Sequence, residues 1–198
     1  MTIDEERQKI VNMTLKLYEL VDGLFQDVES YRGEESYRRA GDVAKLAEEY
    51  KDILMRQATL FIARFQPLAS DLIFAESALS ISYDLYRIAR YLREITIMMK
   101  SIGGELIVEK DAMEALLLSR RMLNQAVKIF ATGDLRTLEE VLKSDDMIDE
   151  VYRKYLNKLG SSKEVSVSVA ATLLFMRHVE RIADHATYIA KAAERTWS

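Results

Sequence analysis

Apolar residues recur every three or four positions along most of this chain, which is the spacing of amphipathic helices. Alternation of apolar and polar residues, the pattern of a half-buried strand, is hard to find. Helix-breaking residues interrupt the helical spacing at Gly33, Pro67, Gly103, Gly104, Gly133 and Gly160. The pattern therefore predicts an all-α fold of six helices. Their expected ranges, to within about two to four residues, are 4–31, 34–65, 69–100, 105–131, 134–159 and 162–195.

Residues that favour helix starts support several of these boundaries. Ser70 and Asp71 follow the proline turn, and Asp134 follows a glycine. Ser161 precedes Glu164 by three positions, which is the spacing of a capping box. Because the connections are short, consecutive helices are expected to pack antiparallel.

The third and sixth predicted helices repeat one sequence frame. The letters RIA occur at residues 87–89 and again at 181–183, and Ile95 and Ile189 stand at the same offset. Three amphipathic helices can close a core that two cannot, so the repeat indicates an internal duplication of a three-helix unit. The sequence therefore predicts two tandem three-helix bundles, residues 1–102 and 103–198, divided at Gly103 and Gly104.

Composition narrows the classes of function. The 198 residues are 49% hydrophobic and 30% charged, which is typical of soluble globular proteins. A formal charge of -4 disfavours a nucleic-acid binder, and the absence of cysteine excludes disulfides and thiolate metal sites. The N-terminus is acidic, and the longest apolar tract, VSVSVAATLLFM, is too short and serine-rich to span a bilayer. We expect a cytoplasmic protein with no membrane insertion.

Two carboxylates of the last predicted helix lie opposite its apolar stripe. Glu180 and Asp184 are four residues apart, on the side of the helix away from the predicted core. The simpler interpretation is a solvated acidic face, paired with Arg177 and Arg181 at helical spacing.

The fifth predicted helix favours a second interpretation, in which acids of the fifth and sixth helices together bind a cation. Asp145 occupies an apolar position of its stripe, with Asp149 beside it, whereas Ala44 stands at the matching place in the second helix. A carboxylate in an apolar stripe costs free energy unless it is exposed, paired or bound to a cation. The alternative is that Asp145 marks a frayed or kinked part of this helix near Ser144.

The residues of the four-acid cluster are Asp145, Asp149, Glu180 and Asp184. Their hard oxygen ligands suit Mg, Mn, Fe or Ca better than Zn. His178 and His185 fall on another flank and are expected to be edge or partner-facing groups rather than ligands. A ferritin-like di-iron enzyme is disfavoured because the chain has no Glu-x-x-His.

Three stretches of the chain resemble the PhoU family of phosphate-uptake regulators: RFQPLASDL (64–72), DDMID (145–149) and RHVERIADHATYIA (177–190). The resemblance implies two tandem three-helix bundles with acidic motifs, which in some members bind multinuclear clusters of iron or other metals. The second bundle keeps these motifs as the four-acid cluster. In the first, Tyr86, Arg90 and Ala44 replace acids and only Glu48 is retained, so one metal cluster or none is expected.

The resemblance also implies a function. It implies a cytoplasmic negative regulator of phosphate uptake that contacts the ATPase subunit of the phosphate ABC transporter and, where one exists, a sensor histidine kinase. A homodimer is a further expectation. No nucleophile with a base and no phosphate-binding glycine loop is evident, so an enzyme is not expected. Two alternatives stay open: a metal-buffering or oxidase-like bundle protein, and a ligand-free helical adaptor.

Overall fold

A computed structural model describes residues 2–102, 108–161 and 164–198. These residues form six long α-helices and a single 3-10 turn, and the described part of the chain contains no strand, which confirms the all-α prediction. The elements are α1 (Ile3–Glu29), α2 (Glu34–Phe65), α3 (Ser70–Ser101), α4 (Lys110–Thr132), η1 (Leu135–Thr137), α5 (Leu138–Ser161) and α6 (Val167–Trp197).

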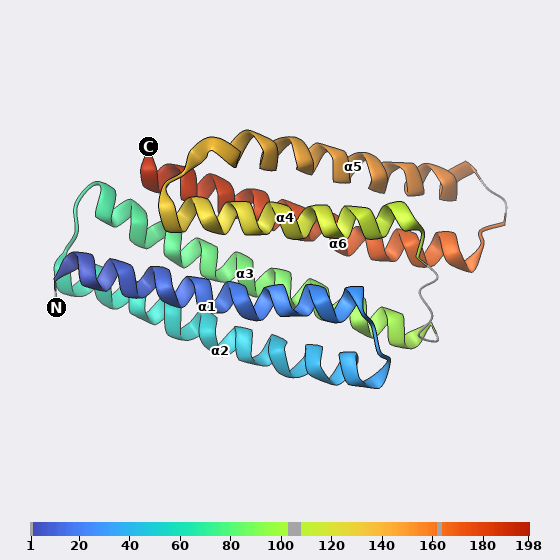
Figure 1. Ribbon diagram of the computed structural model, residues 1–198, viewed down its shortest axis with the longest axis horizontal. Helices are drawn as coiled ribbons and strands as arrows, with labels where there is room; N and C mark the ends of the chain where they lie inside the picture. The colour runs from blue at the N-terminus through green and yellow to red at the C-terminus, as the bar shows by residue number, and fades with distance from the viewer. Residues whose placement is uncertain (1, 103–107, 162–163) are drawn as a thin grey trace.

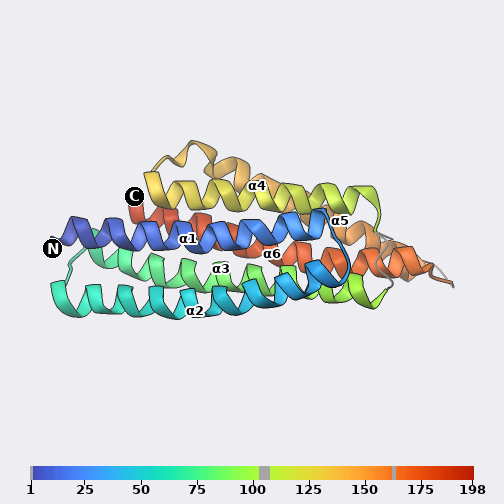
Figure 2. The same cartoon turned by 60° about the horizontal axis from the view of Figure 1, so that its bottom comes forward.

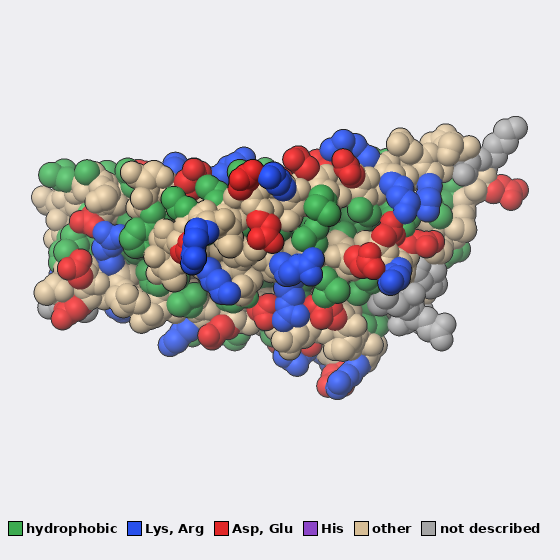
Figure 3. Space-filling view, turned by 45° about the horizontal axis from the view of Figure 1, so that its top comes forward, with side chains coloured by type: hydrophobic (Ala, Val, Ile, Leu, Met, Phe, Trp, Pro, Cys, Tyr) green, Lys and Arg blue, Asp and Glu red, His purple; other side chains and the backbone are tan. Residues whose placement is uncertain are grey.

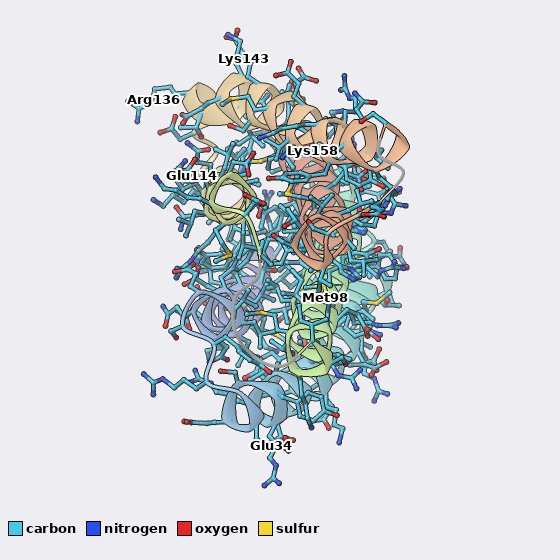
Figure 4. All side chains as sticks on the ribbon, turned by 90° about the vertical axis from the view of Figure 1, so that its right-hand side faces the viewer. Glu34, Met98, Glu114, Arg136, Lys143 and Lys158 are labelled. Atoms are coloured by element: carbon cyan, nitrogen blue, oxygen red, sulfur yellow. The ribbon has the colours of Figure 1, made fainter. Side chains whose placement is uncertain are left out.

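The helices are arranged as two groups of three that lie side by side along their length (Figure 1). Helices α1, α2 and α3 pack together, as do α4, α5 and α6, and the main contact between the groups is α3 against α6. Figure 1 and the end view in Figure 4 place α2 and α5 on the two outer sides, far from each other, and Figure 2 shows α2 along the lower edge. The predicted dividing residues, Gly103 and Gly104, lie outside the described residues, so the division into 1–102 and 103–198 stays a prediction.

The repeated RIA frame belongs to the core that joins the two groups. Ile88 and Ala89 of α3 are completely buried, and so are Ile182 and Ala183 of α6 to within 1%. Buried residues of all six helices form one continuous apolar core. The duplication visible in the sequence therefore preserves the positions that hold α3 against α6.

Some predicted helix ends are wrong by several residues. Helix α6 begins at Val167 rather than 162, because the Ser166 side chain accepts a hydrogen bond from the Val169 N–H and caps it. Ser161, the predicted cap, instead lies in the last turn of α5. Helix α4 begins at Lys110, and the predicted start at 105 lies outside the described residues.

The other start signals have different outcomes. Asp134 caps the turn η1 by accepting the Arg136 N–H at 3.2 Å. Ser70 and Asp71 do not cap α3, because the cap position is Ala69 and has no side-chain hydrogen bond. Asp71 is instead ion-paired with Arg7 of α1.

Gly133 ends α4 in a conformation that only glycine adopts without strain. Its φ is +74°, and a Cβ atom there would lie 2.9 Å from the Trp197 ring. The Trp197 Nε1–H donates to the Phe130 carbonyl oxygen at 3.1 Å. This contact fixes the C-terminal end of α6 against α4 and so helps to position α6 in the second bundle.

Candidate functional site

Helix α5 presents Asp145 at the boundary between core and surface. Val141 and Ile148, on the neighbouring turns, are buried, and Asp145 itself is partly buried. The helix runs without interruption from Leu138 to Ser161, and the Ser144 hydroxyl donates to the Glu140 carbonyl oxygen at 2.8 Å. Asp145 therefore does not mark a frayed or kinked helix, and that alternative is wrong.

The structure brings the four-acid cluster into one electrostatic neighbourhood across α5 and α6. Burial, and then the charges of Asp184 and Asp149, raise the pKa of Asp145 to about 6. Burial and the Asp184 charge likewise raise the pKa of Glu180, against the effect of two nearby arginines. Asp145 and Glu180 are thus harder to ionise because they are buried and lie near other carboxylates, which is the condition under which a cation binds favourably.

Arginines of α6 pair with both acids of that helix. Arg177 Nη1 lies 2.9 Å from Glu180 Oε2, and Arg181 Nη1 lies 2.8 Å from Asp184 Oδ2. Arg181 Nε also approaches Glu180 Oε2 at 3.3 Å. The Glu180 and Asp184 side chains are only 14% and 23% exposed. The predicted pairing with arginine is confirmed, but these carboxylates are largely covered rather than freely solvated.

Thr187, which the sequence pattern did not single out, also belongs to this site. It lies one turn beyond Asp184 on α6, is 4% exposed, and its hydroxyl partly opposes the raised pKa of Asp145. Its Oγ1 makes no hydrogen bond of ordinary geometry with any described residue. A buried hydroxyl without such a bond is unusual and adds a further oxygen donor beside the acids.

The fit of these residues to a metal ion depends on the arginines. The donors are carboxylate and hydroxyl oxygens, which suit hard cations. As the side chains stand, no three His, Asp or Glu groups among the described residues converge closely enough to hold a metal ion. The pairs with Arg177 and Arg181 hold Glu180 and Asp184 along α6, and Arg153 Nη2 lies 3.4 Å from Asp149 Oδ2 on α5. These ion pairs compete with any cation for the same carboxylates.

At the matching place in the first bundle, the side chains form a hydrogen bond and a cation–π contact instead of an acidic cluster. The Tyr86 hydroxyl of α3 donates to Glu48 Oε1 of α2 at 3.1 Å. The Lys51 ammonium lies 4.6 Å from the centre of the Tyr86 ring, and Ala44, one turn before Glu48 on α2, is buried. Tyr86 and Ala44 stand where the second bundle has Glu180 and Asp145, so among the described residues this face keeps Glu48 as the one matching carboxylate, and the Tyr86 hydroxyl is bonded to it.

The two histidines line the contact between α3 and α6. His185 Nδ1 lies 2.8 Å from Asp84 Oδ1, and the His178 ring centre is 6.1 Å from that of Tyr91. Burial lowers the pKa of His178. The offset of 94 residues from Arg87 to Arg181 also relates Asp84 to His178 and Tyr91 to His185. The repeat itself could therefore have shown that these residues meet in pairs across a pseudo-twofold axis, rather than at an outer edge.

The remaining surface carries no dominant charge of one sign on the face drawn in Figure 3, where acidic and basic side chains are interspersed. None of the described helices has an apolar stretch long enough to cross a bilayer.

Comparisons with known proteins agree on one family. The PhoU domain matches residues 112–193, which include the four-acid cluster. A phosphate-specific transport system accessory protein PhoU homolog of Caulobacter vibrioides is 32% identical over 177 residues, covering 78% of this chain and 73% of that protein. A homolog with the same name from Archaeoglobus fulgidus is 27% identical and covers 98% of this chain and 97% of its own length. The fold matches the crystal structure of PhoU from Pseudomonas aeruginosa with a TM-score of 0.81 at 20% identity, over 97% of each chain.

Proposed function

The chain belongs to the PhoU family, and we propose that it is a cytoplasmic accessory protein that restrains phosphate uptake by contact with other proteins. The observation that carries this proposal is the alignment with proteins named as phosphate-specific transport system accessory proteins, which extends over 98% of the chain in one relative. The fold agrees with this alignment, because it matches the fold of PhoU from Pseudomonas aeruginosa over 97% of each chain. The repeated core residues of α3 and α6 are buried, as a conserved packing arrangement of the two bundles requires. Regulation, rather than catalysis, is the role we assign.

The partner we propose is the ATPase subunit of the phosphate ABC transporter, with a sensor histidine kinase as a second partner where one exists. Two long helices, α2 and α5, lie on the outer sides of the molecule and offer extended surfaces for such contact. Recognition along helix surfaces needs no preformed pocket for a small substrate. The proposal therefore places partner binding on the helix faces rather than in a cavity.

We further propose that the four-acid cluster holds a hard cation, with iron expected and Mg or Mn as alternatives. A bound cation would supply the positive charge that offsets the repulsion among these carboxylates. Arg177 and Arg181 provide that charge while no cation is bound, through ion pairs of 2.9 Å and 2.8 Å. Cation binding would then release both guanidinium groups to the surrounding surface and change the charge that a partner meets.

Deletion of the gene in the source organism tests the regulatory role. We expect phosphate uptake and accumulation in phosphate-rich medium to rise in the deletion strain, and to return to the starting level when the intact gene is restored. Recovery of the transporter ATPase with the tagged protein from phosphate-replete cells would support direct contact. Unchanged uptake together with unchanged expression of the transport genes would contradict the proposal.

A further inference from the structure

A cavity of about 880 Å³ lies in the seam between the two bundles, where α1 runs beside α4 (Figure 1). Side chains of α1, of α4 and of the turn around η1 line it. Cavities of this volume at the junction of two folded units are a preferred place for small-molecule ligands. The cavity is separate from the four-acid cluster, which belongs to α5 and α6.

Part of the cavity wall consists of polar groups that already pair with one another. Arg120 Nε and Nη2 lie 2.7 Å and 2.8 Å from the two carboxylate oxygens of Asp22, and its Nη1 lies 2.9 Å from Glu29 Oε1. The Asn124 side-chain amide donates to the Tyr18 hydroxyl at 2.7 Å. These bonds tie α4 to α1 and offset the charge of Arg120, so none of these groups is free to bind a ligand.

The second acid of the cavity wall is paired as well. Asp134 Oδ2 lies 2.5 Å from Nη2 of Arg136, whose side chain does not line the cavity. Both carboxylates in the wall, Asp22 and Asp134, therefore already have their negative charge offset by an arginine. The charge that remains for a ligand comes from the other side chains.

Four further polar side chains of the wall have no partner. Arg121, Gln125, Lys128 and Thr137 form no side-chain hydrogen bond or ion pair within the part of the chain that the structure describes. The first three are spaced by four and three residues and so lie on one face of α4. All four can donate hydrogen bonds, and two are cations. The unpaired chemistry of the cavity is positive and rich in donors, which suits an anion with many acceptor oxygens.

We propose that this cavity binds a small molecule that carries a chain of two or more phosphate groups, as a nucleoside polyphosphate or an inorganic polyphosphate does. Arg121 and Lys128 stand seven residues apart, about 10 Å along the helix, which favours an anion whose charge extends along α4. A phosphate chain lying over Gln125 brings charge near both cations at once, whereas a single phosphate would fill little of the cavity. The inference depends neither on the four-acid cluster nor on contact with the transporter.

Isothermal titration calorimetry of the purified full chain, in buffer free of divalent cations, tests this site with tripolyphosphate, ATP and orthophosphate. We expect both polyphosphates to bind, and orthophosphate to bind at least about tenfold more weakly because its charge is not extended. Tighter binding of ATP than of tripolyphosphate would assign part of the recognition to the nucleoside, beside the 38% exposed Leu117. Equal or weaker binding of ATP would assign it to the phosphate chain alone.

Two outcomes of this titration would overturn the proposal. One is that neither polyphosphate binds at concentrations up to about 1 mM. The other is that orthophosphate binds as tightly as tripolyphosphate, because the extended arrangement of Arg121 and Lys128 would then play no part.

Three variants test whether the phosphates bind at this face of α4. Gln125→Glu puts a carboxylate between the two cations and should abolish binding, and Arg121→Gln should weaken it by about tenfold. Lys110→Gln is the matched control and should leave affinity unchanged: it also removes one exposed cation from α4, but Lys110 lies outside the cavity lining and pairs with Glu114 at 3.4 Å. Thermal melts should show all three variants folded, because each changes a surface side chain. Binding that survives Gln125→Glu, or that Lys110→Gln weakens as much as Arg121→Gln does, would overturn the assignment.

Discussion

On the α5–α6 face, Asp145 lies among other carboxylates that raise its pKa to about 6, while at the matching place on α2 and α3 the Tyr86 hydroxyl satisfies Glu48 and Lys51 covers the phenol ring. Both faces stand on the same helical frame. The core residues Ile88 and Ile182 are completely buried at corresponding positions. The difference teaches that the duplicated core keeps the same buried positions in both copies, whereas the outward positions of each copy carry different chemistry.

The shared frame makes a prediction about stability. Ile88→Ala and Ile182→Ala each remove a fully buried side chain from the α3–α6 contact and should each cost about 2–5 kcal/mol of unfolding free energy. Denaturant unfolding followed by circular dichroism measures both costs. If one substitution were tolerated without loss, the two helices would not contribute equally to the core.

The frame is also the part of the fold that sequence reasoning predicted best. The range 34–65 for α2 agrees with the structure, because Gly33, with φ of +63°, breaks the helix before it. The predicted start of α6 is wrong because the spacing indicates Ser161 as the cap, whereas the Ser166 side chain accepts the hydrogen bond from the Val169 N–H. Sequence spacing does not show which serine wins, since that depends on how far α5 extends.

The sequence pattern singled out the four acids of the candidate site, but it could not show how their side chains pair with neighbouring groups. Asp145 was found because a carboxylate replaced an apolar residue in a periodic stripe. The pairing of Arg181 with both Glu180 and Asp184 depends on side-chain rotamers, which periodicity does not specify. Thr187 was missed because a threonine in an apolar helix face has no distinctive pattern, and only its buried hydroxyl beside Asp145 identifies it.

Introducing an acid into the first bundle should be unfavourable without a cation. Ala44 is 6% exposed, and Ala44→Asp should destabilise the protein by about 1–3 kcal/mol because a buried carboxylate there lacks hydrogen-bond partners. Ala44→Ser is the uncharged control and should cost less. Asp145→Ala in metal-free protein should have the opposite sign and stabilise the fold. Thermal melts of chelator-treated protein provide the comparison, and equal costs for Asp and Ser at position 44 would contradict it.

Removing the competing arginine should strengthen cation binding. Arg181→Gln frees Glu180 and Asp184 from the guanidinium, so we expect metal affinity to rise by about three- to tenfold, which corresponds to roughly 0.7–1.4 kcal/mol. Arg87→Gln, at the corresponding position of α3, should leave affinity unchanged. Metal titration by calorimetry measures both. Weaker binding by Arg181→Gln would show that the arginine supports the site instead of competing for it.

A smaller effect is expected from pH in metal-free protein. The pKa of Asp145 is about 6 in the fold against an ordinary value of 3.8, so the folded chain keeps this proton to higher pH than the unfolded chain. Its contribution to stability is therefore full below about pH 4 and is lost as the pH rises through 6. Asp145→Asn should flatten the profile of melting temperature in this window. If the melting temperature of the wild type changed with the same slope between pH 4 and pH 6 as that of Asp145→Asn, the assignment would be contradicted.

Metal analysis of three proteins purified without chelators or affinity-tag metals tests most directly whether the second bundle alone holds a cation. The wild type and Glu48→Ala should bind equally, and the double variant Asp145→Ala, Glu180→Ala should bind none. Free metal at a hundred times its dissociation constant should stabilise the first two by about 2.7 kcal/mol, a rise in melting temperature of roughly 5–10 °C, and leave the double variant unchanged. Equal metal content in the wild type and the double variant would contradict the account and leave the four-acid cluster as arginine-paired surface residues.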